Sequence, residues 1–268
     1  MPELPEVQTL VSDLRPVLVG QKVRSIVVHE PLMLGEIAAK DFMLELQGKT
    51  LAAIERRGKY VLFHWKEGGL ILLLHMGQAG WMEVRNKGEE LPKHTKVSWL
   101  FGNGKTLHYI NSRLLGVVAI IHNEDYSTHP SLMNMGPEAW SEKDGPIKVQ
   151  VLAKQIMRSK RPVKEVITDQ TVIAGLGNIW GDEVLFQAGI DPRRPANLLS
   201  QKESSGLVGA ITAVIHKALA IHADLLALPE NYLLRHRKID DICPKCGKPL
   251  EKIKVGARHW YWCPRDQR

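Results

Sequence analysis

The sequence predicts an α+β protein in which a β-sandwich precedes a helical domain. Between residues 23 and 121, short apolar runs rich in β-branched and aromatic residues are separated by turn signals such as Gly102–Gly104. From Lys148 onward, apolar residues recur at helical spacing instead. All three cysteines lie after residue 240, which predicts a small cysteine-bearing hairpin at the end of the chain.

The first half is expected to open with one helix and continue as strands. Apolar spacing predicts a helix from Pro5 to Arg15, ended by Pro16 and Gly20. Short strands separated by turns are typical of a β-sandwich or a barrel, and we expect a sandwich. The predicted strands cover residues 23–28, 51–54, 60–65, 70–74, 81–84, 97–101, 106–110 and 116–121.

The second half is expected to be helical. A polar, turn-rich segment over residues 123–136 is predicted to be a linker. Helices are predicted over residues 148–157, 163–167 and 180–188, and a capping-box signature at Ser200 opens a longer helix to about Ala223. We therefore expect a sandwich domain over residues 1–131, a helical domain over 132–240 and a hairpin over 241–268.

Composition points to a globular protein with an anionic partner. The 268 residues are 44% hydrophobic and 24% charged, with a net charge of +7. A positive balance favours nucleic acid as the partner. No apolar run reaches the roughly 18 residues of a membrane span, and no secretory signal is visible, so we expect a cytoplasmic protein.

The first residues offer a nucleophile. Methionine before proline is usually removed, which would leave Pro2 with a secondary amine at the start of the chain. An α-amino group has a pKa of roughly 7.7–8.0, and its attack on an aldehyde carbon gives a cationic iminium that favours elimination. Glu3 is placed to move protons. The alternative is an ordinary helix start, in which Glu3 and Glu6 complement the helix dipole.

Two internal motifs could contact phosphate. Lys59 lies in the run Arg56–Tyr60 at a strand junction, where the alternative is a solvated cluster of charges. Ala174–Asn178 contains two glycines, and Asn178 stands where the N-cap of the next helix is expected. A helix N-terminus with free N–H groups is a phosphate site, and the alternative is a tight turn between packed helices.

The cysteines indicate a metal site. Cys243 and Cys246 form a Cys-x-x-Cys pair, and a second pair ending one hairpin later would place its last cysteine at 266, where the chain has an aspartate. The alternatives are a histidine as fourth ligand, from His236 or His259, or a hairpin without metal. We expect one structural zinc ion, held by Cys243, Cys246, Cys263 and Asp266. Arg258 lies beside the aromatic run 260–262 of this hairpin, which suits a grip on phosphate.

Taken together, three stretches resemble the formamidopyrimidine-DNA glycosylase (MutM) and endonuclease VIII family of bacterial base-excision repair enzymes. Residues 2–6, Pro-Glu-Leu-Pro-Glu, are similar to the formamidopyrimidine branch. Residues 174–190 resemble the helix–two-turn–helix motif of the family, and residues 243–267 resemble its zinc finger. The resemblance covers the whole chain.

The resemblance implies a role for each matching residue. Pro2 would attack C1′ of the damaged nucleotide, and Glu3 would serve as general acid and base. Lys59 would contact the phosphate beside the lesion. Asn178 and Arg258 would clamp the DNA backbone. The damaged base would be flipped out of the duplex, because C1′ is otherwise shielded.

The sequence departs from the family pattern where the undamaged partner base is read. The family inserts a methionine, an arginine and a phenylalanine into the duplex. This chain has Gln78 at the methionine position, keeps Arg113, and has Leu115 at the phenylalanine position. Leucine can still wedge between bases. The segment Ala223–Cys243 is shorter than the corresponding region of typical family members, which carries the loop that covers 8-oxoguanine, so ring-opened purines are the expected substrates.

The expected activity is that of a bifunctional DNA glycosylase and AP lyase, which releases the base and cleaves the strand by β,δ-elimination. The expected partner is double-stranded damaged DNA, bound by a monomer at the nucleoid. One alternative is an AP lyase with little base excision, favoured by the altered base-reading residues. The other is a non-catalytic module that binds damaged DNA, which retention of Met1 would favour.

Overall fold

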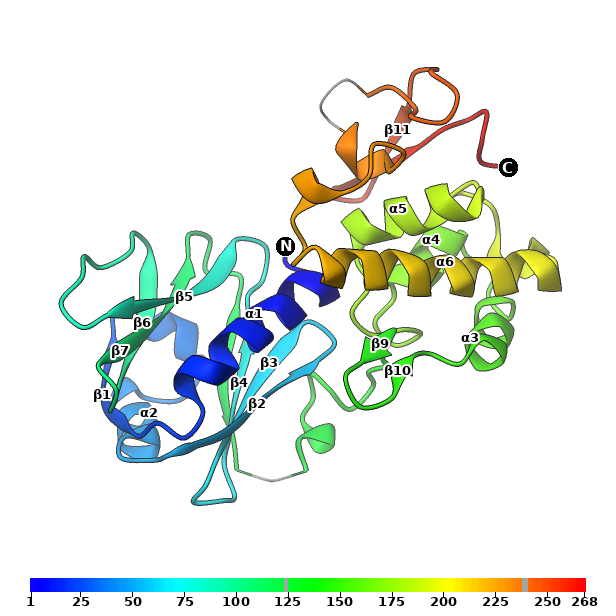
Figure 1. Ribbon diagram of the computed structural model, residues 1–268. Coiled ribbons are helices and arrows are strands. Elements are labelled where there is room, and N and C mark those ends of the chain that lie inside the picture. The colour runs from blue at the N-terminus through cyan, green and yellow to red at the C-terminus, as the bar shows by residue number, and fades with distance from the viewer. Residues whose placement is uncertain (123–124, 238–240) are drawn as a thin grey trace. The chain divides into compact units, whose positions relative to one another are not determined.

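The computed structural model describes residues 1–122, 125–237 and 241–268. The chain divides into two compact units (Figure 1). Unit 1 comprises Met1–Pro2 and Glu6–Met133, and unit 2 comprises Glu3–Pro5 and Asn134–Arg268. Each unit buries its own hydrophobic cluster. The leading helix therefore has its first residues, Leu4 and Pro5, in unit 2 and the rest, from Glu6 onward, in unit 1.

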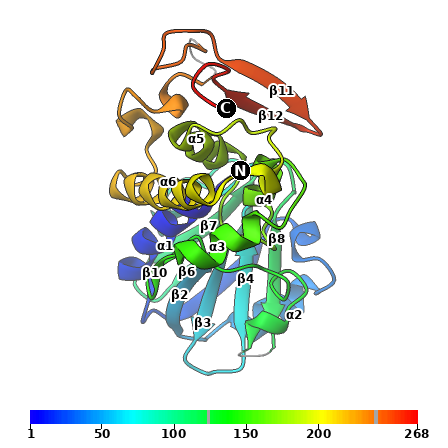
Figure 2. The ribbon, with the colours of Figure 1, turned by 90° about the vertical axis from the view of Figure 1, so that its right-hand side faces the viewer.

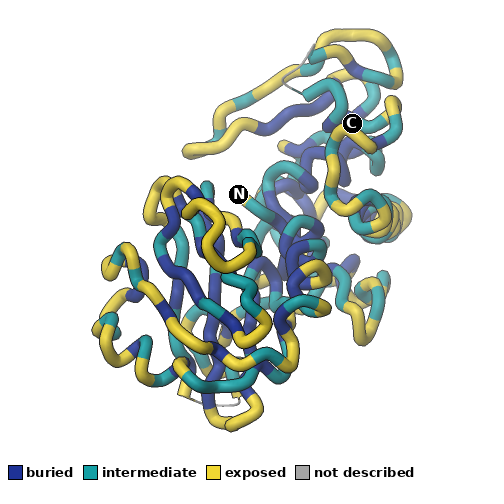
Figure 3. Tube along the Cα trace, turned by 60° about the vertical axis from the view of Figure 1, so that its left-hand side comes forward, coloured by how far each residue is buried: buried dark blue, intermediate teal, exposed yellow. Residues whose placement is uncertain are grey.

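Unit 1 contains two antiparallel four-stranded sheets, which confirms the predicted N-terminal sandwich of strands. One sheet has the order β1-β6-β7-β5 and the other the order β2-β3-β4-β8. The strands are β1 (Val23–Val28), β2 (Leu51–Arg57), β3 (Tyr60–Trp65), β4 (Ile71–His75), β5 (Gly80–Asn86), β6 (Thr95–Phe101), β7 (Lys105–Asn111) and β8 (Val117–Ile121). In Figure 3, buried residues lie mainly along the strands and exposed residues mainly at the turns between them.

Helix α1 (Leu4–Leu18) is longer than predicted, because Pro16 does not end it. Proline removes one N–H donor near the end of a helix, where one lost bond costs least. The next turn still forms, since Val19 N donates to Arg15 O at 3.1 Å, and Leu18 is fully buried. The 3-10 turn η1 (Pro31–Leu34) and helix α2 (Ala39–Leu46) were not predicted from sequence.

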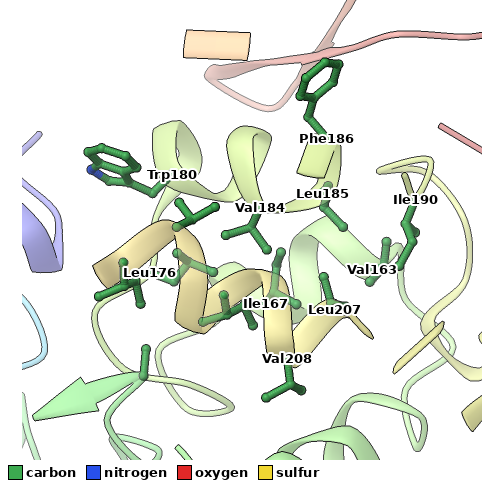
Figure 4. Close-up of a cluster of buried hydrophobic side chains, with 14 of the residues drawn as sticks. Val163, Ile167, Leu176, Trp180, Val184, Leu185, Phe186, Ile190, Leu207 and Val208 are labelled. Atoms are coloured by element: carbon green, nitrogen blue, oxygen red, sulfur yellow. The ribbon is translucent and has the colours of Figure 1, made fainter. Parts of the chain in front are cut away.

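Unit 2 is mainly helical, as predicted. Its elements are β9 (Trp140–Ser141), β10 (Gly145–Pro146), α3 (Val149–Ile156), α4 (Val163–Thr168), α5 (Asn178–Ala188), η3 (Ala196–Leu198), α6 (Gln201–Ala220), η4 (Leu225–Ala227) and η5 (Leu233–Arg235). The capping box is present at Ser200, whose hydroxyl accepts from Glu203 N. Leu176, Trp180, Val184 and Leu207 lie in the core that packs these helices together (Figure 4).

The last segment forms the predicted hairpin, β11 (Glu251–Val255) paired with β12 (Arg258–Trp262) (Figure 2). The predicted linker over 123–136 contains the short turn η2 (Tyr126–Thr128), and its residues 123–124 lie outside the described residues. Residue 240, the predicted end of the helical domain, also lies outside them. Within the described ranges, no helix combines the length and the apolar character that a bilayer crossing requires.

Candidate active site and metal centre

Glu3 is buried in unit 2 and caps helix α5. Its side chain is 2% exposed. One carboxylate oxygen accepts hydrogen bonds from Gly177 N at 2.8 Å and Trp180 N at 3.2 Å, and the other accepts from Ile179 N at 2.8 Å. These are N–H groups that a helix leaves unpaired at its start. The positive end of the helix dipole also complements the negative charge of the carboxylate. Pro2, the predicted nucleophile, is half-buried and directly precedes this fixed acid.

The two glycines before α5 make room for Glu3 and Leu4. A Cβ atom at Gly177 would lie 2.3 Å from the Glu3 carboxyl carbon. Gly175 has φ +97°, and a Cβ there would lie 2.7 Å from a Leu4 methyl group. Leu4 N also donates to Gly175 O at 3.0 Å. The glycine turn is therefore shaped around the start of the chain.

The predicted N-cap role of Asn178 is wrong. Helix α5 begins at Asn178, and its N-cap is Gly177, which has no side chain that could cap the helix. The carboxylate of Glu3 takes three N–H groups of this helix start, so these donors are not open to a phosphate. Asn178 Nδ2 instead donates to His259 O at 3.1 Å. That bond ties α5 to strand β12, where the neighbouring Arg258 is exposed.

In unit 1, Lys59 lies beside a histidine that the sequence reading missed. Lys59 is 6% exposed at the turn from β2 into β3. Burial and then the Lys59 charge lower the pKa of His75 to about 4, so its imidazole is neutral at pH 7. Gly77 N donates to His75 Nδ1 at 3.1 Å, which leaves the hydrogen on Nε2. Lys59 and His75 thus supply an ammonium and an N–H donor. The only signal in the sequence was the position of His75 directly before a glycine-containing turn.

Arg56 stabilises the turn that contains Lys59. Its Nε donates to Gln8 Oε1 and its Nη1 to Gly58 O, each at 2.9 Å. Gly58 has φ +56°, which suits the tight turn between the two strands. The alternative of a solvated charge cluster therefore does not describe this arginine.

The three base-reading candidates lie on two adjoining loops of unit 1. Gln78, Arg113 and Leu115 are exposed, and Arg113 Nη1 donates to Gln78 Oε1 at 3.2 Å. The loops are locked together, because a Cβ at Gly77 would lie 2.0 Å from Leu115 O. Asn111 Nδ2 also donates to Met76 O at 3.1 Å. The structure therefore presents an arginine, held by an amide, beside an exposed leucine on a rigid support.

The metal-binding candidates come together at the base of the β11–β12 hairpin. The ligand atoms of Cys243, Cys246, Cys263 and Asp266 all lie within 4.8 Å of one another. Cys246 Sγ and Cys263 Sγ are 3.4 Å apart, and one Asp266 oxygen lies 3.1 Å from Cys243 Sγ. Tetrahedral zinc with Zn–S bonds of about 2.3 Å places its ligand atoms about 3.5–3.8 Å apart, so these residues fit one structural zinc ion.

Asp266, rather than a histidine, completes the group. His236 Nε2 pairs with Glu230 O at 2.9 Å, and neither His236 nor His259 belongs to the cluster. The chemistry of the donors also fits, because thiolates and a carboxylate together satisfy zinc. Zinc bound there would hold the two ends of the hairpin together, and with four protein ligands its role would be structural.

Glu183, on α5, is a buried acid that the sequence did not single out. Burial raises its pKa to about 7, against the opposing effect of its hydrogen bonds. Its oxygens accept from Leu233 N at 3.3 Å and Leu234 N at 2.9 Å. The carboxyl group therefore fastens the segment between α6 and the hairpin to helix α5.

Three family models match the chain in order. The formamidopyrimidine-DNA glycosylase N-terminal domain matches residues 1–118, and the H2TH domain of the same enzymes matches residues 135–228. A zinc finger found in FPG and IleRS matches residues 242–268. These matches cover the three parts in which the candidate residues lie.

Individual relatives agree with the models. The formamidopyrimidine-DNA glycosylase of Geobacillus kaustophilus is 35% identical and is matched over 100% of both chains. The Lactococcus lactis enzyme bound to DNA containing Fapy-dG matches with a TM-score of 0.85 and 28% identity, over 99% of this chain and 100% of that one. The same enzyme bound non-covalently to DNA containing an AP site gives 0.86 and 28%, over 99% of each chain. The chain belongs to the formamidopyrimidine-DNA glycosylase family.

Proposed function

We propose that this protein is a bifunctional DNA glycosylase and AP lyase of base-excision repair, acting on oxidised, ring-opened purines. The observation that carries the proposal is the Glu3 carboxylate, held by three backbone N–H groups one residue after Pro2. An acid fixed in this way stays beside the chain terminus in one orientation, as proton transfer at a reacting carbon requires. Family membership supports the same activity.

In the proposed mechanism, removal of Met1 frees the Pro2 amine. The nitrogen attacks C1′, the bond from C1′ to the base breaks, and the base leaves with the bonding electrons and takes up a proton. The Pro2 nitrogen then loses its own proton, its lone pair expels O4′ from C1′, and O4′ takes up a proton, so that the sugar ring opens to an iminium. This iminium acidifies the C2′ hydrogen. Loss of that proton expels the 3′ phosphate, a second elimination expels the 5′ phosphate, and water releases Pro2 from the sugar. Glu3 gives and accepts the protons of these steps.

The remaining candidates are proposed to hold damaged double-stranded DNA. Lys59 and the N–H of His75 suit a phosphate of the damaged strand, and Asn178 and Arg258 suit the backbone from unit 2. The net charge of +7 favours the same partner. The Lactococcus lactis relative binds DNA with Fapy-dG and DNA with an AP site, which supports both lesions as substrates here. Such a substrate places the protein at the nucleoid in the cytoplasm, and one chain supplies every proposed role, so we propose a monomer.

A second candidate function is AP lyase activity with little base excision. It is favoured by the bond between Gln78 and Arg113, because an arginine occupied by a neighbouring amide has fewer donors for a partner base. A non-catalytic module that binds damaged DNA is a third candidate, and it requires that Pro2 stays blocked by Met1.

Borohydride trapping tests these candidates, because borohydride reduces the iminium to a permanent crosslink. Protein confirmed by mass to begin at Pro2 is mixed with duplexes containing Fapy-dG, 8-oxoguanine or an abasic site. The proposal expects a crosslink at Pro2 with the Fapy-dG and abasic duplexes, sharply reduced trapping in Pro2→Gly, and trapping retained in the neighbouring control Glu6→Gln. A crosslink with the abasic duplex alone would establish the lyase candidate. No crosslink with any duplex would leave the binding module.

A further inference from the structure

Unit 2 buries a cluster of charges that the proposed chemistry does not use. The side chains of Lys164, on α4, and Asp182, on α5, are both 0% exposed and form an ion pair. Arg237 is 9% exposed, and its Nε lies 3.0 Å from the second Asp182 oxygen, without the angle of a hydrogen bond. Buried ion pairs rarely add stability over apolar side chains of the same volume.

Lys164 stabilises the first turn of α5, which binds the Glu3 carboxylate. Its ammonium donates to Asn178 O at 2.8 Å as well as to Asp182 Oδ1. The carbonyl of Asn178 lies in the same first turn of α5 whose N–H groups bind the Glu3 carboxylate. Any shift of this turn therefore moves the donors that position Glu3.

Asp182 holds the strand that carries Arg258. The carboxylate oxygen that binds Lys164 also accepts from Tyr261 N at 3.1 Å. The Arg237 guanidinium stacks on the Tyr261 ring at 4.6 Å, and the Lys164 ammonium lies 5.9 Å from the centre of the Trp260 ring. Together with the bond from Asn178 Nδ2 to His259 O, these contacts set the register of β12 against α5.

We propose that Lys164 and Asp182 are positioning residues that fix two parts of unit 2 to each other: the Glu3 cradle, which is the set of N–H groups of Gly177, Ile179 and Trp180 that bind Glu3, and strand β12, which carries Arg258. The inference rests on the proposed function, since it assigns the two residues to that same reaction. Neither residue touches the reacting atoms. Their effect passes through the backbone of Asn178 on one side and the backbone of Tyr261 on the other, so a change at Lys164 should loosen both sides together.

Hydrogen exchange tests the coupling without any activity. In Lys164→Met, the amides of Ile179 and Trp180, which bind Glu3, should exchange at least tenfold faster, and so should the amide of Tyr261. The control Arg161→Met removes the exposed Arg161–Asp169 ion pair from the same unit and should leave all three amides unchanged. Faster exchange at one side alone, or at neither, overturns the inference.

A single-turnover trapping rate supplies the functional arm. With saturating protein and an abasic duplex, Lys164→Met should trap at least tenfold more slowly than wild type, and Lys164→Arg should recover part of that rate. In a Glu3→Gln background, Lys164→Met should add less than a twofold effect, because saturating protein compensates for a weaker grip by the Arg258 strand and the remaining action passes through Glu3. Equal slowing in both backgrounds points to general destabilisation and refutes the positioning role.

The outcomes also separate this inference from the proposed function. If wild type itself forms no crosslink, the proposed function fails, whereas the exchange result still decides whether the support exists. If Lys164→Met does not fold, as circular dichroism would reveal, Asp182→Asn replaces it. That variant keeps an oxygen for Tyr261 N but loses the charge that holds Lys164. Wild-type exchange at Ile179 and Trp180 in Asp182→Asn would overturn the inference.

Discussion

Gly177→Ala is the sharpest test of how the cradle positions Glu3. The backbone at Gly177, with φ −132° and ψ −159°, is extended and accessible to alanine, so the substitution adds no backbone strain. The added Cβ would instead lie 2.3 Å from the Glu3 carboxyl carbon and 2.4 Å from one of its oxygens. The carboxylate must then retreat by about 1 Å to regain ordinary van der Waals contact.

The cost follows from the bonds that this retreat breaks. Glu3 would lose or lengthen bonds of 2.8, 2.8 and 3.2 Å. Each buried N–H left without an acceptor costs about 1–3 kcal/mol, which should lower the free energy of unfolding. A misplacement of about 1 Å at a reacting group costs on the order of 100-fold in rate. We therefore expect a large rate loss with DNA affinity retained.

The assay is single-turnover cleavage of an abasic duplex at saturating protein, alongside binding to an uncleavable duplex. Gly209→Ala on α6 is the matched control, because its Cβ would meet nothing within 4 Å. That control should keep the wild-type rate and gain about 0.5–1 kcal/mol of stability, since alanine favours a helix over glycine. A Gly177→Ala protein that cleaves at the wild-type rate would refute the assignment of the cradle to catalysis.

Three further predictions concern a titration, the metal and a DNA contact. The pKa of Glu183 is raised from 4.5 to about 7, so between these pH values the folded chain keeps a proton that the unfolded chain loses. The free energy of unfolding of wild type, relative to that of Glu183→Gln, should therefore fall by about 3 kcal/mol as the pH rises from about 4.5 to about 7. Denaturant melts at each pH measure this, and parallel curves would contradict it. Asp266→Cys should hold zinc against a higher chelator concentration than wild type, because thiolate is the preferred ligand of structural zinc, and metal analysis after chelation decides the point. Arg258→Ala should weaken binding to all duplexes alike and reduce the salt slope by about 1, as loss of one phosphate contact requires, whereas an effect confined to one lesion would place Arg258 at the base instead.

Local signals in the sequence predicted most of the fold correctly. Alternation and turn residues located the strands of unit 1, and β1 and β3 match their predicted ranges. The Ser200 capping box marked the start of α6 correctly, because both of its partners lie within one turn. The end of α1 was misplaced at Pro16, since burial of Leu18 outweighs the loss of one terminal hydrogen bond. Helix α2 was missed because it is short and carries no capping signal at its start.

The sequence predicted those residues of the candidate site whose type and spacing by themselves indicate a chemical role. Pro2 and Glu3 stand out by position in the chain, and the cysteines by their spacing. The sequence did not show which backbone groups bind the Glu3 carboxylate. Asn178 looked like a cap because its residue type suits one, yet the side chain that accepts from the first N–H groups of α5 is that of Glu3, which lies more than 170 positions earlier. His75 became a candidate only once Lys59 was seen beside it.

By itself, the sequence determined the family, the two halves of the chain, the nucleophile candidate and the three cysteines of the metal site, because each depends on residue identity at short spacing. Only the tertiary structure decided that Glu3 takes the N–H groups of α5 and that Asp266 joins the cysteines rather than a histidine. It alone brought Lys164 to Asp182. These are contacts between residues far apart in the chain, and they form only when core packing brings distant helices and strands together, which no local pattern encodes.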